Sequence, residues 1–582
     1  MPGFKHLAAE LIAPLAGLET GEVETLLVKP PQPEMGDLGF PCFGLAKKLR
    51  QAPVKIASEL AAKIILGPGS VFTSAQAVGP YVNLSLSPSA LAAATLVPAL
   101  SHPDAWGSAD TGSGKTVVIE YSSPNIAKPL GVHHIRSTML GAALSRLYRL
   151  RGWRVVEMNY LGDWGTTFGQ LMVAYKMREA ENPEQAVDVH ALLQLYLKFH
   201  AEVDSDASLA ASARQWFKRL EDGDPEAVRL WGIFRAESLK DLKKLYQRLG
   251  VDFPDSAFTG EAFFNNRMPA TIKRLREKGL LVESQGAQVV DLAAFGLPPC
   301  LIIKTDGATI YATRDLASAE YRQEAFNFDL SLYVVANQQE LHFRQIFKTL
   351  DLMGYPWAAN CQHVKFGMLS FGPGVFGEGA ATGSTRKGRV IFLEDVLDRA
   401  VEKARALILE GSADKNGVTD SDRLAEQVGV GAVVFSEFLQ RRIKDVSFTW
   451  ERALNLHGDS GPYLQYTHAR LSSLLRRYAA KPSAQANWQR LASPLEKEVL
   501  IQLTAFDSAL GQAVTENEPS LVATYLLELT AVFNRLFTDK ERHRLISDDR
   551  ELTDARMALV EGVRLTLARG LAILGLAAPD AM

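Results

Sequence analysis

Basic side chains stand between an apolar segment and a helix-like pattern early in the chain. Lys128, His133 and His134 follow the apolar run 117–119, and residues 132–150 carry apolar side chains at helical spacing. The free N–H groups and the dipole at a helix N-terminus favour phosphate. These residues therefore predict a phosphate-binding site, the alternative being an ordinary strand–helix junction whose histidines are exposed.

A second strand completes this unit. The expected strand at 116–122, the helix from near Val132 and a strand at 155–160 form a βαβ unit, with Gly152 as the helix stop. The polar segment 159–166 follows the second strand. Ligands bind at the carboxyl ends of strands in such sheets, so this segment is a candidate for ligand contact, although a plain strand-to-helix turn is the alternative.

Tyr311 and Asp315 are four residues apart, so on a helix they share one face. A phenol and a carboxylate facing a cleft could bind a cation, and a carboxylate accepts both prongs of a guanidinium. Spacing alone favours an ordinary surface pair. The polar run 337–343 follows another apolar strand at 332–336 and again suits a ligand.

A glycine-rich loop at 372–383 follows a strand expected at 364–371 and leads to Ser384, Arg386 and Lys387. Such a loop could close on a polyphosphate and stabilise developing charge, or it could be a mobile basic surface loop. The segment 112–116 looks like the end of a phosphate-binding P-loop. Its glycines precede the strand, and Ala109 stands where an earlier glycine is required, so we interpret it as a linker.

Composition sets broad limits. The 582 residues predict three or four domains, 47% hydrophobic and 22% charged residues are typical of globular proteins, and the net charge of −3 gives no general argument for nucleic acid. The scattered Cys42, Cys300 and Cys361 argue against a zinc site or a disulfide framework. No apolar run reaches the length of a membrane span and no signal peptide is recognisable, so we expect a cytoplasmic protein without a membrane partner.

The patterns divide the chain into four blocks. We expect an α+β appendage at 1–110, a Rossmann-like, doubly wound parallel sheet at 111–375, a loop and helical connection at 376–454, and an all-helical bundle at 455–582. Within the second block, 171–295 reads as a mostly helical insertion, and the sheet is expected to resume at 300–304. The bundle is expected to contain helices at 495–510, 520–537 and 554–574.

The segment 123–137 resembles the nucleotide-binding signature of class I aminoacyl-tRNA synthetases, in the arginyl form S-x-N-x-x-K-P-x-H-V-G-H-x-R-S. The positions that match are Ser123, Asn125, Lys128, Pro129, Val132, His134, Arg136 and Ser137. Gly131 stands where the first histidine belongs, and His133 stands where the glycine belongs.

Further motifs of the arginyl-tRNA synthetases follow in the family's order. The Pro/Gly-rich loop 30–41 resembles their N-terminal appendage, and Tyr311–Asp315 resembles their Y-x-T-R-D motif. In three other motifs one residue departs: Tyr160 replaces histidine, Glu340 replaces aspartate and Gly383 replaces methionine. The segments 461–470 and 574–579 are similar to the family's anticodon-binding bundle.

The resemblance implies ATP-dependent attachment of L-arginine to its tRNA through an arginyl-adenylate. Arginine would be held by Glu120, Asn125, Tyr311, Asp315 and Gln339. The catalytic residues would be Lys128, His134, Arg386 and Lys387, with Mg²⁺ sharing the phosphate charge. ATP would contact Gly131, His133, His134, His342, Ser384 and Lys387. The tRNA would contact Phe40, Tyr463, Gln465, Tyr466 and Arg470.

The same resemblance implies ATP, Mg²⁺, L-arginine and tRNA as the partners, no zinc, a monomer, and activation that requires tRNA. We expect His133 to lie beside the nucleotide, while Gly131 gives the turn before the helix its freedom. Two rivals remain. One is a non-catalytic tRNA-binding paralogue, which only the exchange at 131 and 133 supports, and the other is a class I synthetase for another amino acid, against which Tyr311 and Asp315 argue.

Overall fold

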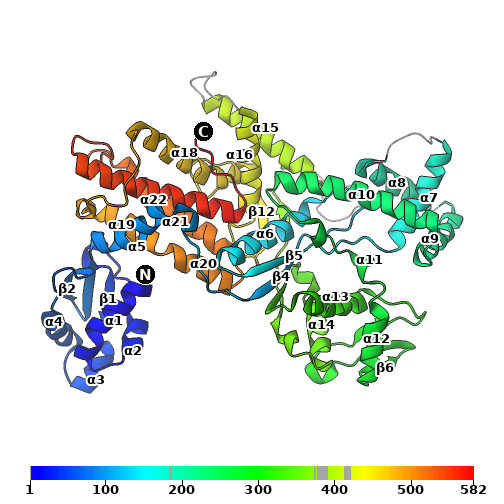
Figure 1. Cartoon of the computed structure of the whole chain (residues 1–582), viewed down its shortest axis with the longest axis horizontal. Coiled ribbons are helices and arrows are strands. Elements are labelled where there is room, and N and C mark those ends of the chain that lie inside the picture. Colours follow the sequence, from blue (N-terminus) through cyan, green and yellow to red (C-terminus); the bar gives the residue numbers. More distant parts are fainter. Residues whose placement is uncertain (1, 182–186, 204, 373–374, 376–390, 412–420) are drawn as a thin grey trace.

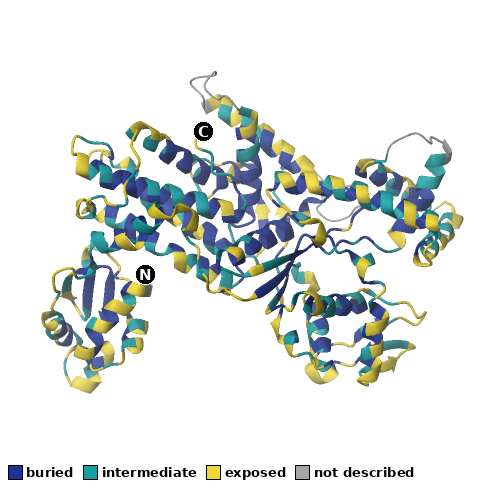
Figure 2. Ribbon diagram, viewed as in Figure 1, coloured by how far each residue is buried: buried dark blue, intermediate teal, exposed yellow. Residues whose placement is uncertain are grey.

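The computed structural model describes all residues except 1, 182–186, 204, 373–374, 376–390 and 412–420. A small N-terminal unit lies at one end of the molecule, beside a large helical bundle. A short parallel sheet occupies the centre, and two further lobes extend on its other side (Figure 1). In the central sheet the strand at 116–120 is fully buried, and the strand at 330–333 is buried except for its first residue (Figure 2).

The N-terminal unit is a three-stranded antiparallel sheet covered by helices. Its strands, in the spatial order β1-β3-β2, are β1 (Leu38–Pro41), β3 (Tyr81–Leu86) and β2 (Phe72–Val78). Its helices are α1 (Pro2–Ala16), α2 (Thr20–Leu26), α3 (Leu45–Leu49) and α4 (Pro53–Lys63). The next helix, α5 (Pro88–Ser101), packs against the helical bundle.

A buried carboxylate ties this unit to the bundle. Asp37 Oδ2 accepts hydrogen bonds from the Leu86 amide and from Lys497 Nζ, each over 2.6 Å. The Asp37 side chain is almost fully buried, so solvent screens this ion pair less than an exposed one. The Pro/Gly-rich loop therefore has a structural role at this junction.

The central sheet is parallel and has the order β10-β9-β4-β5. Its strands are β4 (Thr116–Glu120), β5 (Arg154–Met158), β9 (Leu330–Tyr333) and β10 (Cys361–His363), and α6 (Ile135–Leu150) connects the first two. The chain builds outward from β4 to β5 and later returns to the other side of β4. The strand order thus reverses between β4 and β9, which is where doubly wound sheets bind ligands.

Two strand expectations were wrong. β8 (Cys300–Ile303) does not continue the parallel sheet; it pairs antiparallel with β7 (Ala287–Val290), which pairs with β6 (Leu281–Ser284). The β6–β7 turn uses the left-handed conformations of Gln285 and Gly286, as tight hairpins require. An apolar run of four residues does not reveal which sheet it joins.

The strand expected at 364–371 is divided. Its first part follows β10, and its last part, β11 (Leu369–Phe371), pairs with β12 (Val446–Phe448) in a separate two-stranded sheet. Gly367 lies between them, and a Cβ there would be 2.5 Å from the Lys444 backbone. The close approach of that backbone explains the division.

Two lobes flank the central sheet. One is built from α7 (Thr166–Glu181), α8 (Val189–Glu202), α9 (Ala207–Glu221) and α10 (Pro225–Arg248). The other contains the β6–β8 sheet with α12 (Met268–Glu277), α13 (Tyr311–Phe326) and α14 (Glu340–Leu352), around an apolar core of its own. The short α11 (Glu261–Phe264) precedes α12. The segment expected to be mostly helical thus also holds β6 and β7.

The C-terminal part of the chain is helical apart from β12. Its helices are α15 (Leu393–Gly411), α16 (Ser421–Ser436), α17 (Trp450–Ala453), α18 (Gly461–Tyr478), α19 (Pro494–Thr504), α20 (Phe506–Thr515), α21 (Ser520–Thr538) and α22 (Arg550–Leu574). The single helix expected at 495–510 is two helices, α19 and α20, which meet at Ala505.

Among the residues that the structure describes, one helix, α21, is long and apolar enough to cross a membrane by length and composition alone. Its apolar side chains Val522, Leu526, Leu529 and Phe533 are buried against α19, α20 and α22. The core helix of a bundle passes the same test, so this is weak evidence for a membrane span.

Candidate active site

A cavity of about 270 Å³ opens at the carboxyl ends of β4 and β9, where the strand order reverses. All five residues expected to hold arginine line it, namely Glu120, Asn125, Tyr311, Asp315 and Gln339. They come from five places in the chain: the end of β4, the loop after it, two turns of α13 and the segment before α14. The fold therefore brings together the five residues that the sequence suggested as arginine ligands.

Glu120, the last residue of β4, is buried and forms an ion pair with Arg322. Burial raises the pKa of Glu120, and the guanidinium of Arg322 opposes that rise. The guanidinium also lies 4.3 Å from the centre of the Tyr333 ring. Sequence reasoning missed Arg322, although it follows Asp315 by seven residues and so shares a face of the same helix.

Asp315 and Tyr311 lie on the first turns of α13, as their spacing predicted. The carboxylate is already engaged, because His342 Nε2 lies 2.6 Å from Asp315 Oδ2. The imidazole also contacts the Tyr311 ring, with 5.0 Å between ring centres. His342, expected to contact the nucleotide, lines the same cavity as the candidate arginine ligands.

Two further polar groups line the cavity. Tyr160 replaces the family's histidine, and its hydroxyl is buried with no hydrogen-bond partner within the described part of the chain. Glu261 pairs with Arg314 over 3.1 Å, and burial raises the pKa of Glu261 to about 7. A buried unpartnered hydroxyl at a cavity wall can accept or donate one hydrogen bond to a ligand.

The loop after β4 is held in an unusual conformation. Ser122 and Ser123 both have positive φ angles, of 67° and 47°. Asn159 fixes them, because its Oδ1 accepts from the Ser123 amide over 3.2 Å while its Nδ2 donates to Tyr246 Oη over 2.9 Å. The hydroxyl of Tyr246 also bonds Ser122 Oγ over 2.7 Å. This network sets the path of the chain into Asn125.

A glycine makes room for Asn125. A Cβ on Gly162 would lie 1.9 Å from Asn125 Oδ1, so no other residue fits at that position. The Gly162 amide donates to the Pro124 carbonyl over 3.0 Å, which brings the ends of β4 and β5 together. Gly162→Ala would thus displace Asn125.

The nucleotide signature differs in detail from the expectation. Gly131 is extended, with φ −71° and ψ 147°, and pairs with Phe392; residues Val132–His134 form a 3-10 turn before α6 begins at Ile135. The expected conformational freedom of Gly131 is therefore not used, because any residue adopts this conformation. Gly131 also lies outside the helix, which begins four residues later at Ile135.

The rings of the two histidines of the signature are in contact, with their planes tilted by 38°. Their ring centres are 4.0 Å apart, and His134 Nδ1 lies 3.1 Å from the Gly131 carbonyl oxygen. Burial lowers the pKa of His134 to about 3, and burial with the nearby Lys128 ammonium lowers the pKa of His133. Both imidazoles are therefore neutral at pH 7. Lys128 supplies the positive charge on this side of the site.

The residues Ser384, Arg386 and Lys387 lie outside the described residues. The segment that follows them is anchored at the signature, because the Val132 amide donates to the Ile391 carbonyl over 3.0 Å. The Leu393 amide donates to the Leu130 carbonyl over 2.8 Å. The chain thus leaves the predicted loop directly beside the two histidines.

Two of the expected tRNA contacts have no exposed surface. Phe40 is fully buried in the core of the N-terminal unit, and Gln465 is fully buried in the bundle, where its Nε2 donates to the carbonyls of Gln427 and Ala577. Both side chains are therefore structural in this conformation. A motif shows that a position matters, but it does not distinguish packing from contact.

The other three candidates for tRNA contact lie on α18 and are partly exposed: Tyr463, Tyr466 and Arg470. The Arg470 guanidinium lies 4.3 Å from the Phe537 ring centre and 5.4 Å from the Tyr466 ring centre. Tyr463 accepts a hydrogen bond from Asn534 over 2.8 Å. An aromatic ring beside a guanidinium is a surface on which nucleotide bases stack.

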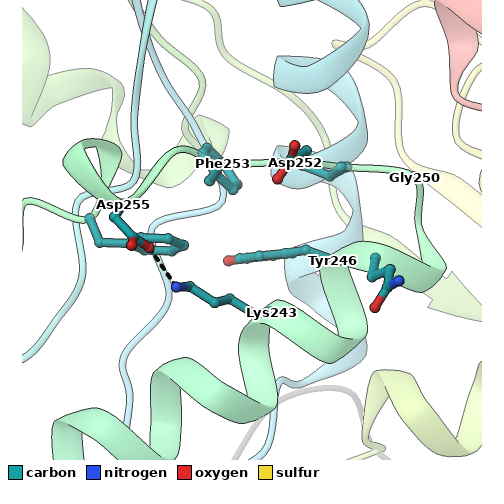
Figure 3. A pocket seen from close by; sticks show the side chains of 9 residues that line it. Lys243, Tyr246, Gly250, Asp252, Phe253 and Asp255 are labelled. Carbon is teal, nitrogen blue, oxygen red and sulfur yellow. Dashed lines mark hydrogen bonds and ion pairs between the residues drawn. The ribbon is translucent and has the colours of Figure 1, made fainter.

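A larger cavity, of about 620 Å³, lies at the end of α10 and is shown in Figure 3. Lys243 and Asp255 form an ion pair of 2.5 Å at its wall, and Tyr246 turns its hydroxyl to the strand-end network described above. None of the residues singled out from the sequence lines this cavity. The smaller cavity at the strand ends is therefore the candidate active site.

The fold and the site define a class. A doubly wound parallel sheet, an acidic cavity at its switch point, and Lys128 in the segment that leads from the first strand into its helix are typical of α/β enzymes that bind a nucleotide and a small cationic substrate. Family models match nearly the whole chain: "Arginyl tRNA synthetase N terminal domain" at 5–86, "tRNA synthetases class I (R), catalytic domain" at 96–450 and "DALR anticodon binding domain" at 464–582.

Comparisons with curated relatives and with solved structures agree with the family models. The chain is 43% identical to the arginine–tRNA ligase of Clostridioides difficile (strain 630), with 97% of each chain covered. It is 41% identical to that of Alkaliphilus metalliredigens (strain QYMF) over the full length of both. The arginyl-tRNA synthetase of Thermus thermophilus has the same fold, with a TM-score of 0.74, 24% identity and 96% of each chain covered. The chain belongs to the arginyl-tRNA synthetases, of class I.

Proposed function

We propose that this chain attaches L-arginine to its tRNA at the expense of ATP, through an arginyl-adenylate, releasing AMP and pyrophosphate. Family membership supports the reaction. The observation that carries it for this chain is the cavity itself, which presents the carboxylates Glu120 and Asp315 at the switch point of a nucleotide-binding sheet, besides Glu261, which pairs with Arg314. The substrate has two cationic groups, and we assign one to Glu120 and the other to Asp315.

Asp315 and Tyr311 bind the substrate guanidinium. Its fork matches the two oxygens of a carboxylate, and the partly exposed phenol of Tyr311 closes over it. The guanidinium displaces His342 from Asp315 Oδ2. Lysine is disfavoured because an ammonium fills only one of the two acceptor positions.

Glu120, Asn125 and Gln339 hold the amino-acid head. The carboxylate of Glu120 receives the α-ammonium, and the side-chain amides of Asn125 and Gln339 complete its hydrogen bonds. This arrangement turns the α-carboxylate away from the two acidic groups. It then faces the nucleotide signature, where Lys128 provides positive charge.

The reaction has two steps. In the first, an oxygen of the arginine carboxylate attacks the α-phosphorus of ATP, and pyrophosphate leaves. In the second, the 2′-hydroxyl of the terminal tRNA ribose attacks the adenylate carbonyl, and AMP leaves. Lys128 with Arg386 and Lys387 stabilises the phosphate charge, and the neutral His133 offers one N–H group. The single N–H of the neutral His134 already faces the Gly131 carbonyl, so His134 orients the turn instead.

Mg²⁺ arrives with the phosphates of ATP and shares their charge. Among the described residues no group of three or more His, Cys, Asp or Glu side chains is arranged to hold a metal. We therefore assign no step of the reaction to a protein-bound ion.

Lys128→Ala should lower kcat for adenylate formation by about tenfold or more while changing the arginine KM little, because the ammonium meets charge that grows on the leaving pyrophosphate. Lys115→Ala is the matched control, since Lys115 is exposed at the opposite end of β4. Steady-state pyrophosphate exchange measures both constants. A change confined to the arginine KM would remove Lys128 from this role.

The tRNA binds across the N-terminal unit and the bundle, and Tyr463, Tyr466 and Arg470 belong to its contact surface. Because Asp37 and Lys497 join these two parts, a single tRNA can span them in a fixed geometry. We further propose that the enzyme is a cytoplasmic monomer and that activation requires bound tRNA.

Pyrophosphate exchange with arginine, measured with and without tRNA, tests the proposal together with tRNA charging. Exchange should appear with arginine and tRNA and should be far weaker with lysine. A folded protein that binds tRNA but neither exchanges pyrophosphate nor charges tRNA would be the non-catalytic paralogue. Strong exchange in the absence of tRNA would overturn only the tRNA requirement.

A further inference from the structure

Arg322 is a buried guanidinium inside the candidate arginine site. Its side chain is 1% exposed, its Nη2 donates to Glu120 Oε2, and its planar head lies over the Tyr333 ring. Its Nε and Nη1 have no hydrogen-bond partner among the residues that the structure describes. Burying a charge is costly unless it is paired, so a residue kept here at such a cost calls for a reason.

We propose that Arg322 is a positioning residue for the substrate: it holds Glu120 as a fixed, ionised acceptor with one free oxygen for the substrate α-ammonium. This inference rests on the proposed role of Glu120. Arg322 occupies Oε2 and leaves Oε1 as the remaining acceptor. Arg322 acts through Glu120 and does not itself contact the reacting atoms.

The surroundings of Glu120 make this counter-ion necessary. Burial and the charge of Asp315 both oppose its ionisation, and of the groups near it only Arg322 and, to a lesser degree, His342 favour the carboxylate. The titratable groups that face it are Arg322, Asp315, His342, Tyr160 and Tyr333. Without Arg322 the pKa of the Glu120 carboxyl would rise further, and a protonated carboxyl has no charge to attract an ammonium.

The ion pair of Arg322 and Glu120 also determines the orientation in which the substrate binds. A guanidinium needs both oxygens of a carboxylate to make its two parallel hydrogen bonds. Glu120 offers only one free oxygen, which is enough for an ammonium. Asp315 offers both of its oxygens once His342 moves away. Arg322 therefore directs the substrate guanidinium to Asp315 and its α-ammonium to Glu120.

The experiment compares Arg322→Met, Arg322→Lys, Glu120→Gln and the double variant Glu120→Gln/Arg322→Met. Arg274→Met is the matched control. Arg274, on α12, pairs over 2.5 Å with Glu320, which lies on the same helix as Arg322 but does not line the cavity. Pyrophosphate exchange gives kcat and the KM values for arginine and ATP across pH. The inhibition constant of 5-guanidinopentanoic acid, which lacks the α-amine, reports on the guanidinium end alone.

Arg322→Met should raise the arginine KM about tenfold or more at pH 7, with the ATP KM unchanged. The acid limb of kcat/KM for arginine should move to higher pH, and Arg322→Lys should restore part of both. The inhibition constant of the deaminated analogue should stay near its wild-type value. An unchanged arginine KM, or an equal loss for arginine and analogue, would overturn the inference.

The double variant keeps the test decisive if Arg322→Met does not fold, because removing both members of a buried pair is far milder than removing one. Arg322→Met should add little to the arginine KM once Glu120 is glutamine; a further tenfold rise in that background would mean that Arg322 acts independently of Glu120 and would refute us. An unchanged KM in Glu120→Gln itself would instead refute the assignment of Glu120 under the proposed function.

Discussion

Replacing Asp315 by asparagine is expected to weaken arginine binding by about 2–5 kcal/mol, the usual cost of removing one partner of a buried hydrogen-bonded charge pair. The amide keeps the shape of the side chain but supplies one acceptor and no charge, so the guanidinium fork loses its match. The His342 imidazole, now 2.6 Å from Asp315, would retain a polar neighbour, and the fold should survive.

The KM values for arginine and ATP in pyrophosphate exchange measure this effect. The arginine KM should rise, and the ATP KM should stay unchanged. Asp351→Asn is the control, because that carboxylate is 60% exposed in a surface pair with Lys348 on the neighbouring helix. Tyr311→Phe should have a smaller effect of the same kind. A wild-type arginine KM in the Asp315 variant would remove this residue from the guanidinium site.

The sequence predicted the parts of the fold whose signals are local. The apolar run at β4, the helical spacing of α6 and the polar groups at strand ends were enough to predict a doubly wound sheet and a ligand site at its edge. Tyr311 and Asp315 lie on one helix face, as four-residue spacing requires. These predictions succeed because helix and strand periodicities are properties of short segments.

The errors concern contacts between distant segments. The apolar residues 300–303 look like a parallel strand, yet the hairpin turn at Gln285 and Gly286 offers them an antiparallel partner. The spacing of Arg322 from Asp315 places it on the same helix face, but its pairing with Glu120, 202 residues away, could not be predicted from the sequence. Gln465 matches a motif expected to contact tRNA, but its side chain is buried and donates a hydrogen bond to the carbonyl of Ala577. Such pairings depend on the tertiary fold.

Arg136, within the nucleotide signature, illustrates how a motif residue can be wholly structural. Its side chain is 1% exposed and forms an ion pair of 3.2 Å with the equally buried Glu437. Its guanidinium also donates to the carbonyls of Lys444, Arg442 and Met368 over 3.0, 3.3 and 3.4 Å. Arg136 thereby fastens the start of α6 to the segment that leads into β12.

Arg136→Met should destabilise the protein by about 3–5 kcal/mol, because it leaves Glu437 buried without a counter-charge. Burial raises the pKa of Glu437 from its ordinary value of 4.5 to about 7 even with Arg136 present, and its loss would raise that pKa further. Below pH 7 Glu437 is protonated in both folded proteins, so this part of the penalty is absent there and appears as pH rises through 7 and beyond.

The deficit in melting temperature of Arg136→Met relative to wild type should therefore be smaller at pH 5 than at pH 8. Arg136→Met/Glu437→Leu is the matched control, since an apolar replacement of both partners in a buried pair is often neutral or stabilising. It should recover much of the lost stability and remove the added pH dependence. What it does not recover reports on the three carbonyl hydrogen bonds. A deficit that is equal at both pH values would show that Glu437 is not the source of the penalty.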